Sequence, residues 1–245
     1  MGPELTASDG VLLVDKPKGL TSHDVVDHIR RRFGFRKVGH CGTLDPIATG
    51  LLVVVIERAT KLQNHMTADD KAYEGIMRLG VSTDSQDADG NMIAEKPIPP
   101  LTQADLEQVF TKFRGDLQQV PPMISAIKYK GQPLYKLARK GKTVEREPRN
   151  IHIYELRMLT FDPPNVGFRV QCTKGTYVRT LCSDIGDTLG CGAHLAELRR
   201  TRSGQFDIKD AKPLDALLNL TREQLQASII PMLKLLRLPG NVPPL

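Results

Sequence analysis

The chain has 245 residues, of which 40% are hydrophobic and 25% are charged, as in an ordinary soluble globular protein. No apolar run approaches the roughly 18 residues that cross a bilayer, and residues 1–9 lack a signal-peptide pattern, so we expect a cytoplasmic protein rather than a membrane or exported one. Four cysteines are too few for a secreted disulfide scaffold, and the net charge of +6 favours a polyanionic partner without establishing one.

Hydrophobic patterns predict strands and a helix in the first part of the chain. A short buried strand is predicted at 10–15, and Thr21 or Ser22 then begins a helix with apolar residues at every fourth position up to Phe33. The elements predicted next are a buried strand at 51–56, an alternating strand at Lys71–Leu79 and, after a polar turn at 82–90, its hairpin partner at Met92–Glu95.

The second part of the chain adds two helices and two strands. Thr102 with Asp105 resembles a capping box, and apolar residues at helical spacing follow it up to a stop at Gly115. The remaining predicted elements are strands at 151–160 and 166–173 and a helix whose apolar side runs from Val178 to Leu189. The predicted fold class is α+β, with a mixed, largely antiparallel central sheet flanked by helices and loops.

We expect one domain over residues 1–238, with a protruding basic segment at 121–148, here called the basic arm, and a disordered tail at 239–245.

Residues 39–50, here called the Asp45 loop, have the sequence GHCGTLDPIATG and lead directly into the buried strand predicted at 51–56. Glycines permit backbone shapes that other residues resist, and a carboxylate on a loop braced by a rigid strand is well placed for catalysis. Taken alone, however, Asp45 followed by Pro46 is more often an ordinary turn. The loop by itself therefore leaves both interpretations open.

Five separated blocks of the sequence occur in the order found in one family. They are VDKPKGLTS at 14–22, the Asp45 loop, KAYE at 71–74, PPMISAIK at 121–128 and GTYVR at 175–179. In that order they resemble the lysine-proline motif, the catalytic aspartate loop, the tyrosine motif, the start of the RNA-gripping insertion and the arginine motif of the TruB-type tRNA pseudouridine synthases. The resemblance covers nearly all of the chain and implies the pseudouridine synthase fold.

The resemblance implies that Asp45 is the nucleophile that converts a flipped-out uridine to pseudouridine. A carboxylate at its reference pKa is ionised at neutral pH and can attack without a separate base. Arg179 matches an arginine that pairs with the catalytic aspartate, and Tyr73 matches a tyrosine that stacks on the base. The reaction needs no redox change or external group, so we expect neither a cofactor nor a metal. Which uridine atom is attacked stays open.

Further residues are expected around the uridine. His40 matches a residue that fills the space left by the extruded base. Tyr177 and Leu198 are expected in the pocket wall, and Lys16 and Pro17 in its floor. Taken alone, His40 would more often be an exposed surface residue of a loop, and Tyr177 and Leu198 are equally consistent with core packing.

The implied substrate is the T-arm of tRNA, at the uridine numbered 55, bound by a monomeric protein. Basic side chains release counterions when they neutralise phosphates, which makes RNA binding depend on salt. The residues expected to contact RNA in this way lie in the basic arm and are Lys128, Lys130, Lys136, Arg139 and Lys140.

Two features depart from the family pattern. Cys41 stands where threonine is usual, and could alter hydrogen bonding in the loop or make it sensitive to oxidation. Bacterial relatives also commonly continue into a small C-terminal RNA-binding domain of the PUA type, which we do not expect here.

Other functions are compatible with some of these residues. A noncatalytic tRNA-binding or RNA-folding protein on the same scaffold is the main alternative, and a thiol enzyme using Cys41 with His40 is a weaker one. The segment Gly141-Lys142-Thr143 is not a phosphate-binding loop, because Lys136 stands where the first glycine is required. Cys182, Cys191 and His194 do not complete a zinc site, because a fourth ligand is missing.

Overall fold

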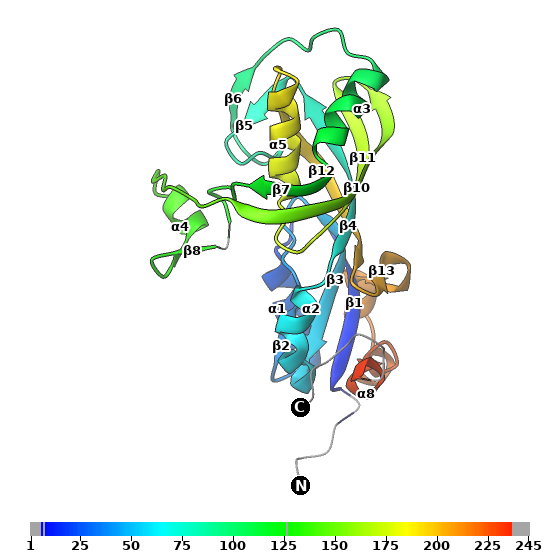
Figure 1. The fold of residues 1–245 in the computed structure, drawn as a ribbon. Helices are drawn as coiled ribbons and strands as arrows, with labels where there is room; N and C mark the ends of the chain where they lie inside the picture. The colour runs from blue at the N-terminus through cyan, green and yellow to red at the C-terminus, as the bar shows by residue number, and fades with distance from the viewer. Residues whose placement is uncertain (1–5, 7, 126, 237–245) are drawn as a thin grey trace. The chain divides into compact units, whose positions relative to one another are not determined.

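The computed structural model describes residue 6, residues 8–125 and residues 127–236 (Figure 1). The chain divides into two compact units: residues 1–71 with 199–245 form the first, and residues 72–198 form the second. The tail predicted at 239–245 lies outside the described residues. The single catalytic domain expected over 1–238 stays a prediction.

The first unit is a sheet with short helices packed around it. Its strands are β1 (Gly10–Lys16), β2 (Val38–His40), β3 (Thr49–Ile56), the end of β12 (Ala193–Ser203), β13 (Phe206–Asp207), β14 (Lys212–Pro213) and β15 (Ile230–Pro231). Its helices are α1 (Ser22–Phe33), α2 (Gln63–Thr67), α6 (Leu214–Leu218), α7 (Arg222–Gln226) and α8 (Met232–Leu236), with 3-10 turns at Glu57–Leu62 and Ile208–Asp210. β3 pairs antiparallel with β1 along one edge, and along the other it pairs with β2 and, in parallel, with β12.

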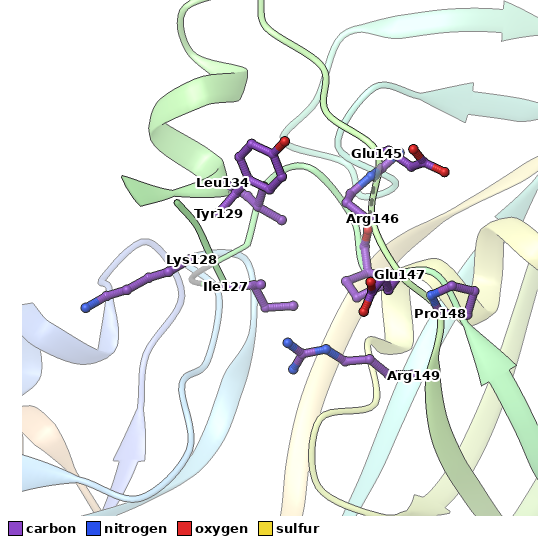
Figure 2. Close-up of a pocket in the computed structure, with 10 residues that line it drawn as sticks. Ile127, Lys128, Tyr129, Leu134, Glu145, Arg146, Glu147, Pro148 and Arg149 are labelled. Atoms are coloured by element: carbon purple, nitrogen blue, oxygen red, sulfur yellow. Dashed lines mark hydrogen bonds between the residues drawn. The ribbon is translucent and has the colours of Figure 1, made fainter. Parts of the chain in front are cut away.

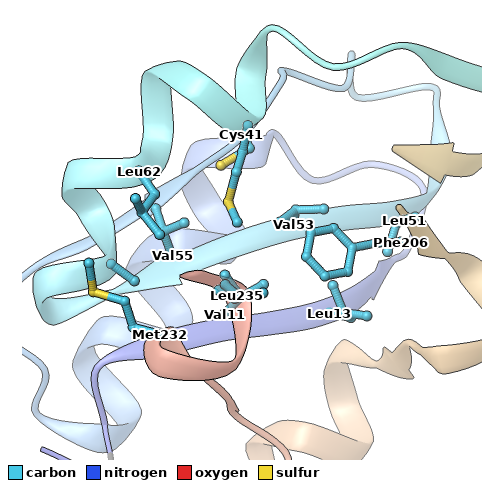
Figure 3. Packing of buried hydrophobic residues seen from close by; sticks show 12 residues of the cluster. Val11, Leu13, Cys41, Leu51, Val53, Val55, Leu62, Phe206, Met232 and Leu235 are labelled. Carbon is cyan, nitrogen blue, oxygen red and sulfur yellow. The ribbon is translucent and has the colours of Figure 1, made fainter. Parts of the chain in front are cut away.

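The central strand β3 is buried on both faces, as its apolar run predicts. Each residue from 51 to 56 is at most 1% exposed. The side chains on one face of β3 pack against alternate residues of β1 and against the side chains of Phe206, Met232 and Leu235 (Figure 3). Burial of aliphatic side chains contributes about 1.5–3 kcal/mol each. The strand is therefore a rigid support for the loop that precedes it.

The predicted helix after Thr21 is confirmed as α1. Thr21 caps it through a capping box, since its hydroxyl accepts from the Asp24 amide and the Asp24 carboxylate accepts from the Thr21 amide. The helix buries the apolar residues at every fourth position, and it ends at Gly34 with a φ of +66°.

The second unit is also a sheet with helices. Its strands are β4 (Lys71–Leu79), β5 (Val81–Thr83), β6 (Met92–Glu95), β7 (Gly115–Gln119), β8 (Lys128–Tyr129), β9 (Gln132–Pro133), β10 (Arg149–Asp162), β11 (Asn165–Cys172) and the beginning of β12. Its helices are α3 (Gln103–Lys112), α4 (Leu134–Ala138) and α5 (Val178–Thr188). Five of the strands adjoin in the order β12-β4-β11-β10-β7, and α3 packs on β10 and α5. Figure 1 shows β8 and α4 projecting from β10 as part of the basic arm.

The fold class is the predicted one, but the predicted hairpin between β4 and β6 is wrong. β6 pairs with β5, with Val81 opposite Glu95, while β4 lies between β11 and β12. Gly80 separates β4 from β5 because its φ of +86° turns the chain. The predicted turn is present, but it joins β5 to β6 in a shorter hairpin that begins after β4.

Candidate active site

The Asp45 loop joins β2 to β3 in the first unit. At its start it continues the β2–β3 pairing, because the Cys41 amide donates to the Val53 carbonyl at 2.8 Å. At its end, Gly50 has a φ of +98°, and a β-carbon there would lie 2.4 Å from the Arg200 carbonyl. Only glycine fits this position. The loop therefore leaves and rejoins the sheet at two fixed points.

Between these points, the backbone on both sides of Asp45 is tied to the β1–α1 connection. The Ser22 hydroxyl is buried; it accepts from the Leu44 amide at 2.8 Å and donates to the Leu44 carbonyl at 3.1 Å. The Gly19 amide donates to the Pro46 carbonyl at 2.8 Å. The residues immediately before and after Asp45 are thus both anchored, which restricts the direction of its carboxylate.

Arg200 anchors the loop from β12. This side chain is 1% exposed; Nε donates to the Leu51 carbonyl at 2.7 Å and Nη2 to the Gly42 carbonyl at 3.0 Å. A guanidinium carries several donors in a fixed plane, so one side chain can bridge two backbone segments. Arg200 was not predicted from the sequence. No local signal marks it, because its partners lie 149 and 158 residues away.

Lys16 is fully buried close to Asp45. Its ammonium donates to the carbonyls of Pro17 at 2.9 Å and Leu20 at 2.6 Å. Burial lowers the pKa of Lys16 to about 8; the Asp45 carboxylate opposes this shift and the Arg200 charge adds to it. Lys16 therefore stabilises the turn before α1 and places a positive charge near Asp45.

A second buried lysine lies beside Cys41. Lys71 donates to the carbonyls of Thr67 and Asp69, and burial lowers the pKa of Lys71 to about 8. Burial also raises the pKa of the Cys41 thiol to about 12, even though the nearby Lys71 charge acts in the opposite direction. A thiol that keeps its proton is a poor nucleophile, which disfavours the thiol-enzyme interpretation. Cys41 instead packs as a small apolar side chain in the core (Figure 3).

His40 is the last residue of β2 and is half-buried, not an exposed loop residue as the sequence suggested. Burial lowers the pKa of His40, with the charges of Arg200 and His23 acting in the same direction, which favours the neutral imidazole. Its Nδ1 atom is buried and has no hydrogen-bond partner among the described residues. Its role beside an extruded base stays a prediction.

In the second unit, Arg179 is the second residue of α5 and is 4% exposed. Its Nη1 lies 3.6 Å from an oxygen of Asp87, which is itself buried, and its Nη2 donates to the Ile124 carbonyl. Asp87 is therefore a charged partner that was not predicted from the sequence. The same guanidinium is bonded to the start of the basic arm, so its position depends on the arm's backbone.

The other residues predicted in this unit are placed by β4, α5 and β12. Tyr177 directly precedes α5, and Gln119 holds its backbone: the Tyr177 amide donates to Gln119 Oε1 at 2.8 Å, and Gln119 Nε2 donates to the Tyr177 carbonyl at 3.1 Å. Tyr73 is on β4 and is 9% exposed, and Leu198 is half-buried on β12. Their contacts with a uridine stay predictions.

The basic arm presents its predicted RNA-contacting residues to solvent. All five predicted residues are exposed, namely Lys128, Lys130, Lys136, Arg139 and Lys140, and so is Lys142. Its short elements are the β8–β9 hairpin and α4, where the Leu134 amide donates to the Ile127 carbonyl at 2.8 Å. Exposed cations on such a segment are available to phosphates.

Over the described part of the chain, no group of three or more His, Cys, Asp or Glu side chains could hold a metal ion. Within the same residues, no helix is both long enough and apolar enough to cross a membrane.

Most of the chain matches known families and proteins. Residues 30–178 match the family model described as TruB family pseudouridylate synthase (N terminal domain), and residues 179–237 match that of the tRNA pseudouridylate synthase B C-terminal domain. The chain is 51% identical over 224 residues to a tRNA pseudouridine synthase B from Opitutus terrae, covering 91% of this chain and 93% of the relative. It is 52% identical over 222 residues to a protein of the same name from Francisella tularensis subsp. novicida, covering 90% and 74% respectively.

Solved structures also resemble this fold. A Cbf5-Nop10-Gar1 complex contains a chain with a TM-score of 0.73 and 32% identity, and an H/ACA RNP bound to a substrate RNA containing 2'-deoxyuridine contains one with a TM-score of 0.70 and 30% identity. Each match covers 93% of this chain, which spans 61% of the length of the solved chain.

Proposed function

Because the chain belongs to the TruB family of pseudouridylate synthases, we propose that it isomerises one uridine of tRNA to pseudouridine with Asp45 as the nucleophile. The observation that carries the assignment to Asp45 is the anchoring of its loop. Ser22, Gly19 and Arg200 bind backbone groups around this one carboxylate. A group held in a fixed direction loses little freedom on reaching the transition state, which accelerates the chemical step.

The reaction breaks the bond between N1 of uracil and the ribose, rotates the uracil and joins its C5 to the same ribose carbon. The C5 proton is lost to water, and N1, which no longer bears the ribose, takes up a proton from water. Lys16 lies near Asp45 and favours a negative charge there. In this proposal Arg179 pairs with Asp45, Tyr73 stacks on the uracil, Tyr177 and Leu198 line its pocket, and Pro17 helps to hold Lys16.

We further propose the T-arm as the part of tRNA that binds, the uridine numbered 55 as the target, and a monomer acting in the cytoplasm. His40 fills the space that the extruded uridine leaves in the loop. The basic arm supplies phosphate contacts, and shape rather than base sequence accounts for much of the recognition.

The test uses a T-arm RNA that carries tritium at C5 of its uridines, because pseudouridine formation releases this tritium to water. We expect release by the wild type and none by Asp45→Asn, a loss of at least about 10⁴-fold. Cys41→Thr is the control in the same loop and should retain activity. Full activity of Asp45→Asn would exclude Asp45 as the nucleophile. RNA binding by a wild type that releases no tritium would instead favour the noncatalytic RNA-binding protein.

A further inference from the structure

The second unit contains a cavity of about 480 Å³ at the base of the basic arm (Figure 2). One side is formed by the β8–β9 hairpin and α4, and the other by residues 145–149, where the chain returns towards β10. Small-molecule sites occupy about 300–1,000 Å³, so the cavity is large enough for a single nucleotide. None of the residues proposed to act on the reacting uridine lines this cavity.

The hairpin presents an aromatic ring at the cavity. Lys130 and Gly131 have φ values of +48° and +83°, and Tyr129 pairs with Gln132 across this two-residue turn. A positive φ is unusual for lysine, so the turn takes up strain to hold this shape. Tyr129, which precedes the turn, lines the cavity and is 39% exposed. Nucleobases stack on exposed aromatic rings of this kind.

The remaining wall is partly apolar and partly charged. Ile127 and Leu134 supply aliphatic surface, and Leu134 is 2% exposed. Arg146 closes the base of the arm by donating from Nη1 to the Pro121 carbonyl at 3.0 Å. Its Nε is buried and has no hydrogen-bond partner among the described residues. An N–H left in this state favours a ligand that brings an acceptor.

Two carboxylates at the cavity favour a base over a phosphate as the group that lies beside them. Glu145 and Glu147 are exposed and line the cavity, while Lys128 and Arg149 line it as exposed cations. Carboxylates repel a phosphate but accept hydrogen bonds from the exocyclic amino group of cytosine, adenine or guanine. Uracil has no such group. The cations can contact the phosphate that adjoins the base.

We propose that this cavity binds one unpaired nucleotide of the RNA substrate, different from the uridine that reacts. Its base stacks on Tyr129, its amino group donates to Glu145 or Glu147, and its phosphate lies against Lys128 or Arg149. RNA is favoured over a free nucleotide because the exposed cations of the arm continue beyond the cavity along α4. This proposal rests on the proposed function only for the identity of the RNA, which is taken to be the substrate.

The first experiment is a set of T-arm RNAs in which each unpaired loop nucleotide is replaced in turn by an abasic one, with affinities measured for wild type and variants. At one position other than the reacting uridine, we expect the abasic change to weaken wild-type binding by roughly 5-fold to 100-fold. Tyr129→Ala should lose this penalty, whereas Tyr129→Phe should keep it. Tyr135→Ala is the matched control, because Tyr135 belongs to the same arm but does not line the cavity.

Equal abasic penalties in the wild type and Tyr129→Ala at every position would overturn the proposal. A second measurement tests the base preference. At the identified position cytidine should bind more tightly than uridine, and the Glu145→Gln/Glu147→Gln variant should lose this difference. A difference that persists in that variant would exclude the carboxylates as the groups that read the base.

Tritium release is measured on the same RNAs, which separates the two proposals. Normal release without a Tyr129-dependent penalty would remove the cavity proposal alone. A Tyr129-dependent penalty with no release from the wild type would remove the proposed reaction and leave the nucleotide site.

Discussion

The Asp45 loop and the basic arm are both irregular segments, but their backbones are held in different ways. The loop is tied by buried side chains, Ser22 and Arg200, whose hydrogen bonds go to its carbonyls and amides. The arm contains short elements, and its basic side chains are exposed. Under the proposed function, this difference separates two requirements. A reacting group must be held in position, whereas a surface that follows RNA must be accessible and charged.

The largest expected effect comes from removing the Arg200 side chain, which anchors the Asp45 loop. Arg200→Met leaves the buried carbonyls of Gly42 and Leu51 without their charged donor, so we expect a loss of about 3–5 kcal/mol in the free energy of unfolding. Misplacement of Asp45 should lower kcat by roughly 100-fold. Denaturant unfolding and tritium release measure the two effects. Arg202→Met, at an exposed position on the same strand, should change stability by less than about 0.5 kcal/mol. Similar effects for both variants would contradict the anchoring role.

Substitutions in the basic arm should instead change RNA binding rather than the stability of the fold. Replacing Lys136, Arg139 and Lys140 with glutamine should raise KM about tenfold or more while kcat stays nearly constant. The slope of log affinity against log salt should become shallower by about 0.7–0.9 for each phosphate that the arm no longer neutralises. Salt-dependent binding and steady-state kinetics are the measurements. The matched control replaces Lys96, Lys112 and Arg157, which are exposed outside the arm. An equal effect in that control would show that the arm acts only through the net charge of the protein and not through contacts of its own.

A milder change within the loop is Ser22→Ala. This variant cannot form the two hydrogen bonds to Leu44, and we expect the free energy of unfolding to fall by about 1–2 kcal/mol and kcat to fall several-fold. Thr21→Ala is a sharp control because it removes the cap of α1 at a cost of about 1 kcal/mol without touching the loop. If both variants lower kcat equally, the effect comes from helix stability and not from the position of Asp45.

The last prediction concerns the pH dependence of stability that arises from the two buried lysines of the first unit. The pKa values of Lys16 and Lys71 are both lowered to about 8, so between pH 8 and their ordinary pKa of 10.5 the unfolded chain binds more protons than the folded one. Stability should therefore rise with pH above about 8, by about 1 kcal/mol per pH unit for each lysine.

This rise is clearest up to about pH 9, because the pKa of the Cys41 thiol is raised from 9.0 to about 12 and acts in the opposite direction above that point. Unfolding by denaturant at a series of pH values measures the slope, which Lys71→Met should reduce by about half. An unchanged slope in that variant would show that Lys71 does not titrate in this range.

Much of the fold could be predicted because its elements carry strong local signals. The apolar run of β3, the capping boxes at Thr21 and Thr102 and the periodicity of α5 all produced the predicted elements. Several short strands were not predicted, and two longer ones, β7 and β12, were missed for an equally physical reason. β7 is mostly polar, and β12 contains several arginines, one of which is buried by hydrogen bonds instead of by apolar contact. Hydrophobic pattern does not detect such strands.

By itself, the sequence determined the family, through five ordered blocks, and through that resemblance it led to the proposal of Asp45 as the nucleophile. It also located the basic arm, because charge is visible without a fold. Only the tertiary structure identified Arg200 as the anchor of the Asp45 loop, Asp87 as a partner of Arg179 and the cavity beside Tyr129. These features depend on contacts between residues that are far apart in the chain. A local sequence pattern does not indicate which distant group a buried side chain will contact.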